Sequence, residues 1–569
     1  MARYFVGIDV GDGESCLAWT SRESSEIHVF RRRNREQSIL TAVAFRDSGS
    51  TDPNSATHTI DDSKIQVLIG EDAVGTPGTS NFTVNFKRPP TTDPSTLAPV
   101  AHFVTALLAE FFNEHPQIRD DCVIYVGHPT GWSVIDVDAY HSSLRGIATD
   151  LRLMPESQSA LLHARDRAVA DTDIDKVLVV DIGSSTIDFT YVQDLEPFNL
   201  DCGATFGCRD LDLAMSTKVR NTLRHNKRFA AALQAEDAQD FLLLACRRVK
   251  EARFSGAQAQ IWDLRQVNNK EFGPIVDKAW SALSTIDMHS LINEPDGWRE
   301  RFAQELTCVR RKLGTEPSRI ILTGGGSRMA FTKDVCREIF PATLVEEDDE
   351  PSFSVARGLA SNGRHVARLT AFRRDMAALL EETTFVAIIE QAVKDYATSI
   401  RRELRKQAIR AQAFPLRALR GRNREALHAA IQPILTEFVP SLAARLADWI
   451  TDASKEICVR YGLDTQRFAI AFAMPAVVSD DLVRQFRLLA INAQSAWMLN
   501  ASYYKLATPR IMAGAMTVSG ILIADYRIRR AVREACSPEF VTGLIDDVRA
   551  SLTPQIDAAA SSAGRFLHA

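Results

Sequence analysis

Two short stretches of sequence constrain the fold of this chain more than any other feature. Residues 6–13 read Val-Gly-Ile-Asp-Val-Gly-Asp-Gly, and residues 177–188 read Val-Leu-Val-Val-Asp-Ile-Gly-Ser-Ser-Thr-Ile-Asp. Each is an apolar run that leads into an aspartate and a small, glycine-containing turn, so a buried strand can present a carboxylate and several backbone N–H groups at one edge of a sheet. Magnesium triphosphate needs this combination, because amides bind phosphate oxygens and carboxylates hold the water shell of the metal. Two such turns, about 170 residues apart, predict a duplicated lobe with a nucleotide between the copies.

Hydrophobic periodicity predicts two regions of different architecture. Residues 1–365 alternate strand and helix patterns, with helices expected over 100–114 and 133–149 and a mainly helical stretch over 211–315. Beyond residue 364, long helical patterns replace this alternation. Strands are predicted at 4–9, 15–20, 41–45, 67–70, 122–127, 177–181, 189–192 and 319–323. We therefore expect an α/β fold with duplicated lobes over 1–365, followed by a mainly α-helical domain over 366–569.

The balance of charge changes at the same boundary. Residues 1–365 carry 40 basic and 52 acidic side chains, and the remainder carries 27 and 20, which together give the net charge of −5. The chain as a whole therefore gives no general signal for nucleic acid. Its nine cysteines include no Cys-x-x-Cys pair, which favours reduced thiols over a zinc site. The sequence shows no secretory signal pattern, and the longest apolar run near its end, 511–524, falls short of the ~20 residues that cross a bilayer, so we expect a cytoplasmic protein without a transmembrane segment.

Four segments, in order, resemble the actin-like ATPase superfamily and, within it, the seventy-kilodalton heat-shock chaperones. Residues 7–16 and 181–188 resemble its two phosphate loops, 323–328 its adenosine loop, and 351–358 the helix that follows. Shorter matches favour the chaperone branch, at residues 70–73, 85–88, 155–162, 206–212 and 246–250. The resemblance spans about residues 3–364 and implies a two-lobed, actin-like domain that binds ATP or ADP with Mg²⁺.

The resemblance implies catalytic roles for four residues. Asp9 and Asp181 would hold magnesium through water, and Glu156 would help them orient the attacking water. Asp181 would also accept the proton of that water. Lys87 would offset the charge that builds on the transferred phosphoryl group, which is the largest contribution that a protein makes in a loose phosphoryl transition state.

The binding residues that the resemblance implies fall into two groups. The first group surrounds the phosphates, where glycines let backbone amides approach closely and a threonine adds a hydroxyl; it comprises Gly11, Asp12, Gly13, Gly183, Ser184, Ser185, Thr186 and Gly207. The second group forms the slot for adenine and ribose and comprises Lys250, Gly324, Gly325, Gly326 and Arg328.

The chain departs from the family pattern at several of these positions. Asp12 and Gly13 stand where two threonine-like residues are usual, and a carboxylate there would repel phosphate unless it turned away or met the metal. Ser184 and Ser185 replace two glycines. Glu251 stands where a basic partner for adenine is usual, and a glycine at 326 replaces a ribose-binding hydroxyl. These changes predict slow hydrolysis or weak affinity.

The C-terminal part does not continue the resemblance. A chaperone of this family would add an acidic linker, a β-sandwich for peptides and a helical lid, but residues 366–369 read Val-Ala-Arg-Leu and helical patterns follow. We expect 366–569 to hold a protein client or partner. The arginine-rich stretch from Arg401 to Arg424 is a weaker candidate for contact with nucleic acid or anionic lipid. Residues 468–475 are predicted to form a strand, and the apolar run 511–524 a buried helix.

These observations predict an ATP-hydrolysing, chaperone-like conformational switch, in which closure of a cleft on Mg-ATP is coupled to a partner on the C-terminal domain. Three alternatives stay open: an actin-like filament-forming ATPase, a small-molecule kinase of the sugar-kinase branch, and a nucleotide-binding scaffold with little hydrolysis. The scaffold hypothesis stays open because Asp12 and the two serines after Gly183 depart from the pattern of the hydrolysing family. No catalytic carboxylate for a sugar can be placed in the first lobe.

Overall fold

The computed structural model describes residues 2–32, 38–47, 65–76, 78–167, 176–193, 196–204, 206–234, 236–255, 273–413, 422–463, 522, 525–534 and 536–564. The chain divides into two compact units, Met1–Ala367 and Arg368–His568. The first unit contains sheets and helices, whereas all regular structure described in the second unit is helical. The predicted mixed α/β class and the helical C-terminal region are therefore confirmed.

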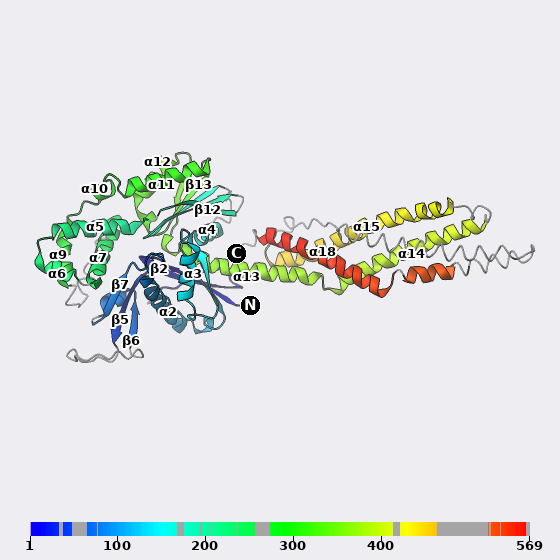
Figure 1. The fold of residues 1–569 in the computed structure, drawn as a ribbon, viewed down its shortest axis with the longest axis horizontal. Coiled ribbons are helices and arrows are strands. Elements are labelled where there is room, and N and C mark those ends of the chain that lie inside the picture. Colours follow the sequence, from blue (N-terminus) through cyan, green and yellow to red (C-terminus); the bar gives the residue numbers. More distant parts are fainter. Residues whose placement is uncertain are drawn as a thin grey trace, which may run out of the picture. The chain divides into compact units, whose positions relative to one another are not determined.

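The first sheet is built around strand β1 (Tyr4–Val10). Its strands follow the order β3-β2-β1-β8-β9, and β4 pairs with β2. Strand β1 runs antiparallel to β2 and parallel to β8, which in turn runs parallel to β9. The other strands are β2 (Glu14–Ser21), β3 (His28–Val29), β4 (Ile39–Leu40), β8 (Cys122–His128) and β9 (Leu151–Pro155). Figure 1 shows this sheet in blue and cyan.

A second sheet repeats this order of strands around β10 (Val177–Ile182). The order is β12-β11-β10-β13-β14, in which β10 runs antiparallel to β11 and parallel to β13, and β13 runs parallel to β14. All six residues of β10 are buried, as a continuous apolar run covered on both faces requires. Strands β1 and β10 thus hold equivalent places, and each carries its aspartate next to its last residue. The remaining strands are β11 (Ile187–Gln193), β12 (Glu196–Ala204), β13 (Arg319–Thr323) and β14 (Leu344–Glu347).

A small third sheet and a set of helices complete the first unit. The third sheet has the order β6-β5-β7 and consists of β5 (Ala42–Asp47), β6 (Ile65–Ile69) and β7 (Ser80–Val84). The α-helices are α1 (Glu71–Gly75), α2 (Leu97–Glu114), α3 (Val134–Ser143), α4 (Glu156–Arg167), α5 (Cys208–Thr222), α6 (Lys227–Ala232), α7 (Glu236–Ser255), α9 (Gly273–Ser284), α10 (Met288–Ile292), α11 (Trp298–Leu313) and α12 (Ala330–Ile339). Short 3₁₀ turns are η3 (Pro94–Thr96), η4 (Pro116–Ile118), η5 (Gly325–Arg328) and η6 (Pro351–Phe353).

Helix α2 belongs to the core beside the first sheet. Its apolar side chains, among them Phe103, Leu107 and Phe111, are fully buried in one cluster with Val6 and Ile8 of β1. Within the described ranges, the segment Pro94–Glu114 is long and apolar enough to cross a bilayer. The burial of its side chains in this cluster explains its apolar composition, because a helix that faces a core needs the same residue types.

Helix α13 (Ser354–Leu379) packs closely against β1 and α4, with no side chain between the backbones at two positions. A Cβ atom on its Gly358 would lie 1.7 Å from the carbonyl oxygen of Ser159 in α4. A Cβ atom on Gly7 of β1 would lie 2.2 Å from the carbonyl oxygen of Ala356. Both positions therefore require glycine because backbone meets backbone there.

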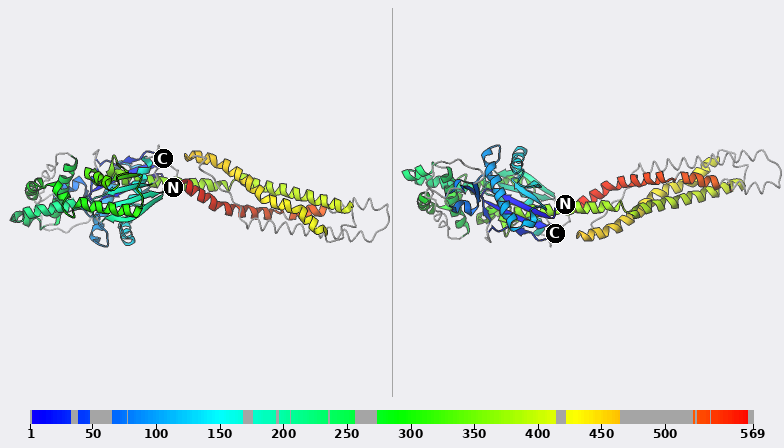
Figure 2. Two further views of the ribbon diagram at one scale, coloured as in Figure 1. Left: turned by 90° about the horizontal axis from the view of Figure 1, so that it is seen from above. Right: turned by 90° about the horizontal axis from the view of Figure 1, so that it is seen from below.

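The described part of the second unit includes three long helices, α14 (Thr383–Ala413), α15 (Arg422–Arg460) and α18 (Pro538–Gly564). Helix α14 packs against both of the others, and Figure 2 shows the three lying side by side. They share one apolar core, whose fully buried members are Phe372, Met376, Phe385, Ile389, Leu442 and Ala560. The predicted strand 468–475 lies outside the described residues, as does nearly all of the apolar run 511–524.

All eight strands predicted for residues 1–365 are present, and the described residues contain six further strands that were not predicted. The unpredicted strands are β3, β4, β7, β9, β12 and β14; five of them are sheet edges, and β4 pairs only with β2. Strands β9 and β12 each contain a proline, which a sheet tolerates at an edge, where one side of the strand needs no partner. The helix predicted over 133–149 is shorter than expected and ends at Ser143. Gly146 (φ +87°) follows in a conformation that favours glycine and does not continue a helix.

Candidate active site

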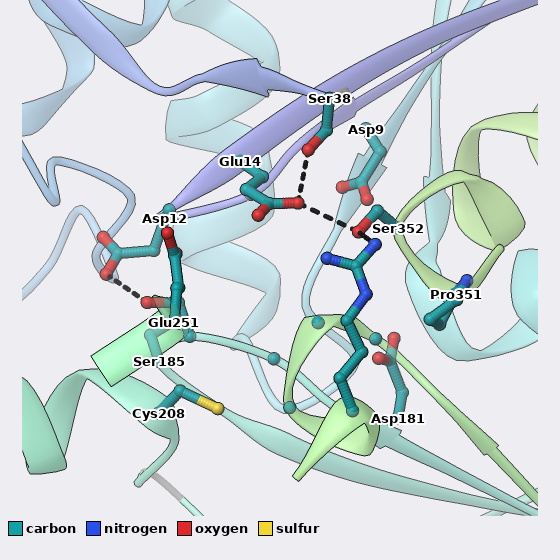
Figure 3. A pocket seen from close by; sticks show the side chains of 18 of the residues that line it. Asp9, Asp12, Glu14, Ser38, Asp181, Ser185, Cys208, Glu251, Pro351 and Ser352 are labelled. Atoms are coloured by element: carbon teal, nitrogen blue, oxygen red, sulfur yellow. Dashed lines mark hydrogen bonds between the residues drawn. The ribbon is translucent and has the colours of Figure 1, made fainter. Parts of the chain in front are cut away.

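A cavity of about 450 Å³ lies where the ends of β1 and β10 approach each other. Asp9 and Asp181 enter it from opposite sides (Figure 3). Sixteen of the seventeen predicted site residues line this cavity: Asp9, Gly11, Asp12, Gly13, Lys87, Glu156, Asp181, Gly183, Ser184, Ser185, Thr186, Lys250, Gly324, Gly325, Gly326 and Arg328. The seventeenth, Gly207, does not line it. The structure thus brings together residues from segments that are more than 300 positions apart in the sequence.

The acidic strand ends carry carboxyl groups that are unusually hard to ionise. Burial, followed by the charge of Glu156, raises the pKa of Asp9 to about 7, although Lys87 opposes the rise. Asp181 faces Asp188 directly across the β10–β11 ladder. Burial and then the Asp188 charge raise the pKa of Asp181 well above its usual range, and burial and Glu156 raise that of Asp188 to about 6. The sequence analysis did not select Asp188, although it ends the second motif.

Lys87 is the cation that faces these carboxylates. It lies just beyond β7, in a chain turned by Asn85 (φ +57°), and its side chain is only 2% exposed. The ammonium forms an ion pair with Glu156 and lies 4.0 Å from the Asp9 carboxylate. Burial alone would lower the pKa of Lys87, but Glu156, Tyr140 and Asp9 together outweigh burial and hold this pKa above its usual value. Lys87 is therefore charged at neutral pH and is aimed at the acidic strand ends.

The donor set fits a hydrated magnesium ion. Asp9, Asp181, Asp188 and Glu156 place four carboxyl groups around one ammonium, and their repulsion contributes to the raised pKa values of the three aspartates. Such a surplus of oxygen donors favours a hard cation. Within the described part of the chain, no group of three or more His, Cys, Asp or Glu side chains is arranged to hold a metal directly. These carboxylates would accordingly bind magnesium through its water shell.

Asp12 does not face the cavity as an uncompensated charge. Its Oδ2 atom lies 3.2 Å from the guanidinium of Arg209 and accepts a 3.4 Å hydrogen bond from the Ser184 hydroxyl. Its Oδ1 atom accepts a 3.3 Å hydrogen bond from the backbone N–H of Lys87. Asp12 is 3% exposed. The departure from threonine at this position is therefore offset by an arginine from α5, and the aspartate ties the first loop to the second.

Helix α5 supports the second loop with its first backbone amides. The N–H of Cys208 donates to the carbonyl of Gly183 (3.1 Å), and that of Arg209 donates to the carbonyl of Ser184 (2.8 Å). The amide of Gly207 donates to Asp210 (3.0 Å). Gly207 thus has a supporting place behind the loop and not the predicted place in the cavity wall. Its missing side chain makes room for the loop, because a Cβ atom would lie 2.5 Å from the Ser184 carbonyl oxygen.

The loop after β13 closes the other end of the cavity. Gly324 (φ +76°) passes so near Asp181 that a Cβ atom would lie 2.3 Å from its Oδ1. Arg328 donates to the Ser352 hydroxyl (2.9 Å), and Ser352 donates to Glu14 (2.9 Å), which also accepts from Ser38 (Figure 3). This chain of hydrogen bonds links the start of β2 to the β13 loop, so the two sheets share side-chain contacts at the cavity.

In the predicted adenine slot, the positive charge of Lys250 is paired with a carboxylate. Lys250 lines the cavity, but its ammonium is bound by Asp212 (2.8 Å) and by the carbonyl of Cys208 (2.9 Å). Glu251 lines the same wall, and burial followed by Glu14 raises its pKa. Arg247 also lines the cavity and was not predicted. Arg247, Lys250, Glu251 and Phe254 lie on one face of α7, because they are three or four residues apart. Once Lys250 is assigned to the site, this spacing indicates the other three residues as cavity-lining.

A scan of the chain against models of known protein families found no match, and a search of curated proteins found none either. The assignment of a function therefore rests on the motifs and on the geometry described above.

Proposed function

We propose that the first unit is a two-lobed, actin-like domain that binds Mg-ATP in this cavity and hydrolyses it. The observation that supports this proposal most is the meeting of Asp9 and Asp181, which occupy equivalent places in two sheets of the same strand order, in one cavity with Lys87. Glycine-containing turns follow both aspartates, so backbone amides and carboxylates are available at the same place. The resemblance to the actin-like ATPases in the sequence agrees with this arrangement.

Each residue has a distinct task in the proposed reaction. Asp181 accepts the proton of the attacking water, because burial and the Asp188 charge raise its pKa and so make its carboxylate a stronger base than an ordinary one. Asp9 and Asp181 orient magnesium-bound water, and magnesium supplies charge neutralisation on the phosphate oxygens. Lys87 exchanges its ion pair with Glu156 for the transferred phosphoryl group, where its charge stabilises the transition state.

We further propose that hydrolysis drives a chaperone-like conformational switch that acts on a protein partner bound by the second unit. The second unit has its own apolar core, which is what an independent binding module requires. Of the arginine-rich stretch, residues 414–421 lie outside the described residues, and Arg401 is paired with Asp525 at 3.6 Å. This pairing uses one charge of the stretch internally and favours a protein partner over nucleic acid.

The test uses calorimetry and phosphate release on the full chain. We expect heat on addition of ATP with magnesium, and release of phosphate without any added sugar. Asp181→Ala is expected to lower turnover by about 10²-fold or more while ATP still binds, because only proton transfer and water orientation are lost. Absence of binding heat in the wild-type chain, or unchanged turnover in Asp181→Ala, would contradict the proposal. Sedimentation of the protein only with ATP would favour a filament-forming ATPase.

A nucleotide-binding scaffold with little hydrolysis is the second candidate. It is favoured by the contact between Lys87 and Glu156, because a lysine held by a carboxylate is not available to phosphate until the pair opens. Binding heat for ATP without phosphate release in the same assays would select this candidate.

A further inference from the structure

Arg247 contacts three separate parts of the proposed nucleotide site at once. It lies on α7 and is 4% exposed. Its guanidinium donates to the carbonyl of Gly13 in the first loop (3.1 Å), to the Ser184 hydroxyl in the second loop (3.4 Å), and to the Asn85 side chain, two residues before Lys87. A planar guanidinium has its donors in a fixed fork, so these three contacts fix the spacing of the three segments.

The first loop is shaped around this arginine. A Cβ atom on Gly13 would lie 2.9 Å from Cζ of Arg247, which is closer than a real side chain tolerates. Glycine at 13 therefore admits the guanidinium, and the arginine occupies the space that a loop side chain would fill. Between Gly11 and Gly13 the loop carries no side-chain donor for phosphate, since Asp12 can only accept when it is ionised.

This wall of the cavity carries charges of both signs. Arg247 and Lys250 both line the cavity, and one carboxylate lies between them, that of Asp212, at 3.8 Å from the arginine and 2.8 Å from the lysine. All three side chains are buried. Asp12 is compensated separately by Arg209 (3.2 Å). Glu251 also lines this wall, so its side chains carry charges of both signs, and Arg247 is set apart by its three contacts with the loops.

We propose that Arg247 is the positioning residue of the triphosphate site. It holds the first loop, the second loop and the Lys87 segment at the spacing that a triphosphate requires. This inference rests on the proposed function, and it assigns to one arginine and one glycine, Gly13, a joint role in selecting triphosphate over diphosphate.

The test is a double-mutant cycle on residues 13 and 247. The affinities for a non-hydrolysable ATP analogue and for ADP, both with magnesium, are measured by calorimetry. Arg247→Ala is expected to weaken the triphosphate analogue by about 10- to 100-fold, and ADP by less, because the lost contacts organise the loops that meet the terminal phosphate. Gly13→Ser is also expected to weaken the analogue, because its Cβ atom displaces the guanidinium.

The combination of both changes separates positioning from simple stability. With Arg247 replaced by alanine, the serine at 13 has room and offers its hydroxyl, so the double variant is expected to bind the analogue more tightly than Arg247→Ala alone. A double variant no better than Arg247→Ala would overturn the inference, as would Gly13→Ser binding as tightly as wild type. If Arg247→Ala is recovered unfolded, Arg247→Lys replaces it, with an expected loss of about tenfold because lysine reaches one acceptor at a time.

Arg253→Met is the matched control. Arg253 lies on the same helix, but it donates to the backbone carbonyls of Leu283, Ser284 and Ile286 outside the cavity. Its replacement is expected to leave both affinities unchanged, and an equal loss in Arg253→Met would overturn the inference.

Hydrogen exchange without nucleotide distinguishes failure of this inference from failure of the proposed function. Amides of residues 11–13, 85–87 and 184–186 are expected to exchange faster in Arg247→Ala than in wild type, and unchanged in Arg253→Met. If wild type binds no nucleotide but this pattern appears, the proposed function falls and the positioning role stands. If wild type binds and exchange in Arg247→Ala is unchanged, the inference falls alone.

Discussion

Lys87 is the buried cation that faces the carboxyl groups of Asp9 and Asp181, so its removal tests the electrostatics of the site most directly. We expect Lys87→Ala to lower phosphate release by about 10²- to 10³-fold, because the transition state loses its main compensating charge. The fold is expected to persist, since Glu156 lines the cavity, where water can solvate its carboxylate once the lysine is removed. Circular dichroism and phosphate release measure the two effects. Turnover within threefold of wild type would contradict the role assigned to this lysine.

The raised pKa of Asp9 makes the metal-free protein sensitive to pH. In the unfolded chain this group titrates near 3.8, whereas in the fold its pKa is about 7, and that of Asp188 is about 6. Between these values the folded form binds more protons than the unfolded form. The contribution of these groups to the free energy of unfolding is therefore present at low pH and is lost as the pH rises towards 7.

Melting in EDTA at pH values from 5.5 to 7.5 checks this dependence. Asp9→Asn removes the ionisation, so we expect its melting temperature to vary less with pH than that of wild type and to exceed it at pH 7.5 by about 2 °C. Activity is expected to be lost in the same variant. Parallel pH profiles of the two proteins would show that Asp9 titrates normally.

At the scale of residues, the sequence predicted the cavity lining well and the contacts within it poorly. Sixteen predicted residues line the cavity, because apolar strands that end in Asp and Gly can be recognised locally. The partners of Asp12 were not foreseen, since Arg209 lies 197 positions away and only the folded chain brings the two together. Arg247 was overlooked although it stands in the same short run as Lys250.

Among the elements, the crossing of α13 and α4 depends on the absence of one side chain. Gly358→Ala would place a methyl group 1.7 Å from the Ser159 carbonyl oxygen, so one helix backbone must move. We expect the first unit to lose about 1–3 kcal/mol of stability, the usual cost of overpacking. Urea unfolding measures the loss.

The control for this substitution is Gly543→Ala in α18, where nothing lies within 4 Å of the added atom. Alanine is expected to stabilise that helix by about 0.5–1 kcal/mol, because it restricts the unfolded chain and favours helix. Equal effects of the two substitutions would mean that the crossing tolerates a side chain.

The elements also mark where prediction from sequence works. Strands in the interior of a sheet, such as β1, β8, β10 and β13, were predicted because burial on both faces demands apolar runs. Edge strands other than β6 escaped prediction; β12, for example, reads Glu-Pro-Phe-Asn-Leu-Asp-Cys-Gly-Ala and contains few strand-forming residues. Their place in the sheet comes from pairing with a neighbour, which composition does not reveal.

For the molecule as a whole, the division of the chain after Ala367 predicts that the first unit folds alone. The sequence analysis had expected a boundary at 365, where the charge balance changes. A fragment ending at Ala367 is expected to be soluble, to melt in a single transition and to bind ATP within about threefold of the full chain, because every cavity-lining residue precedes the cut. An insoluble fragment, or one that has lost ATP binding, would contradict this division.

The cavity lining begins at Asp9 and ends at Val355. A chain emerges from the ribosome in order, so Asp9 is synthesised long before most of the residues that line the cavity with it. The cavity can form only when almost the entire first unit has been synthesised. The proposed nucleotide can therefore not assist the early steps of folding during synthesis. On this proposal, a nascent chain binds nucleotide only after its first 355 residues have been synthesised and folded.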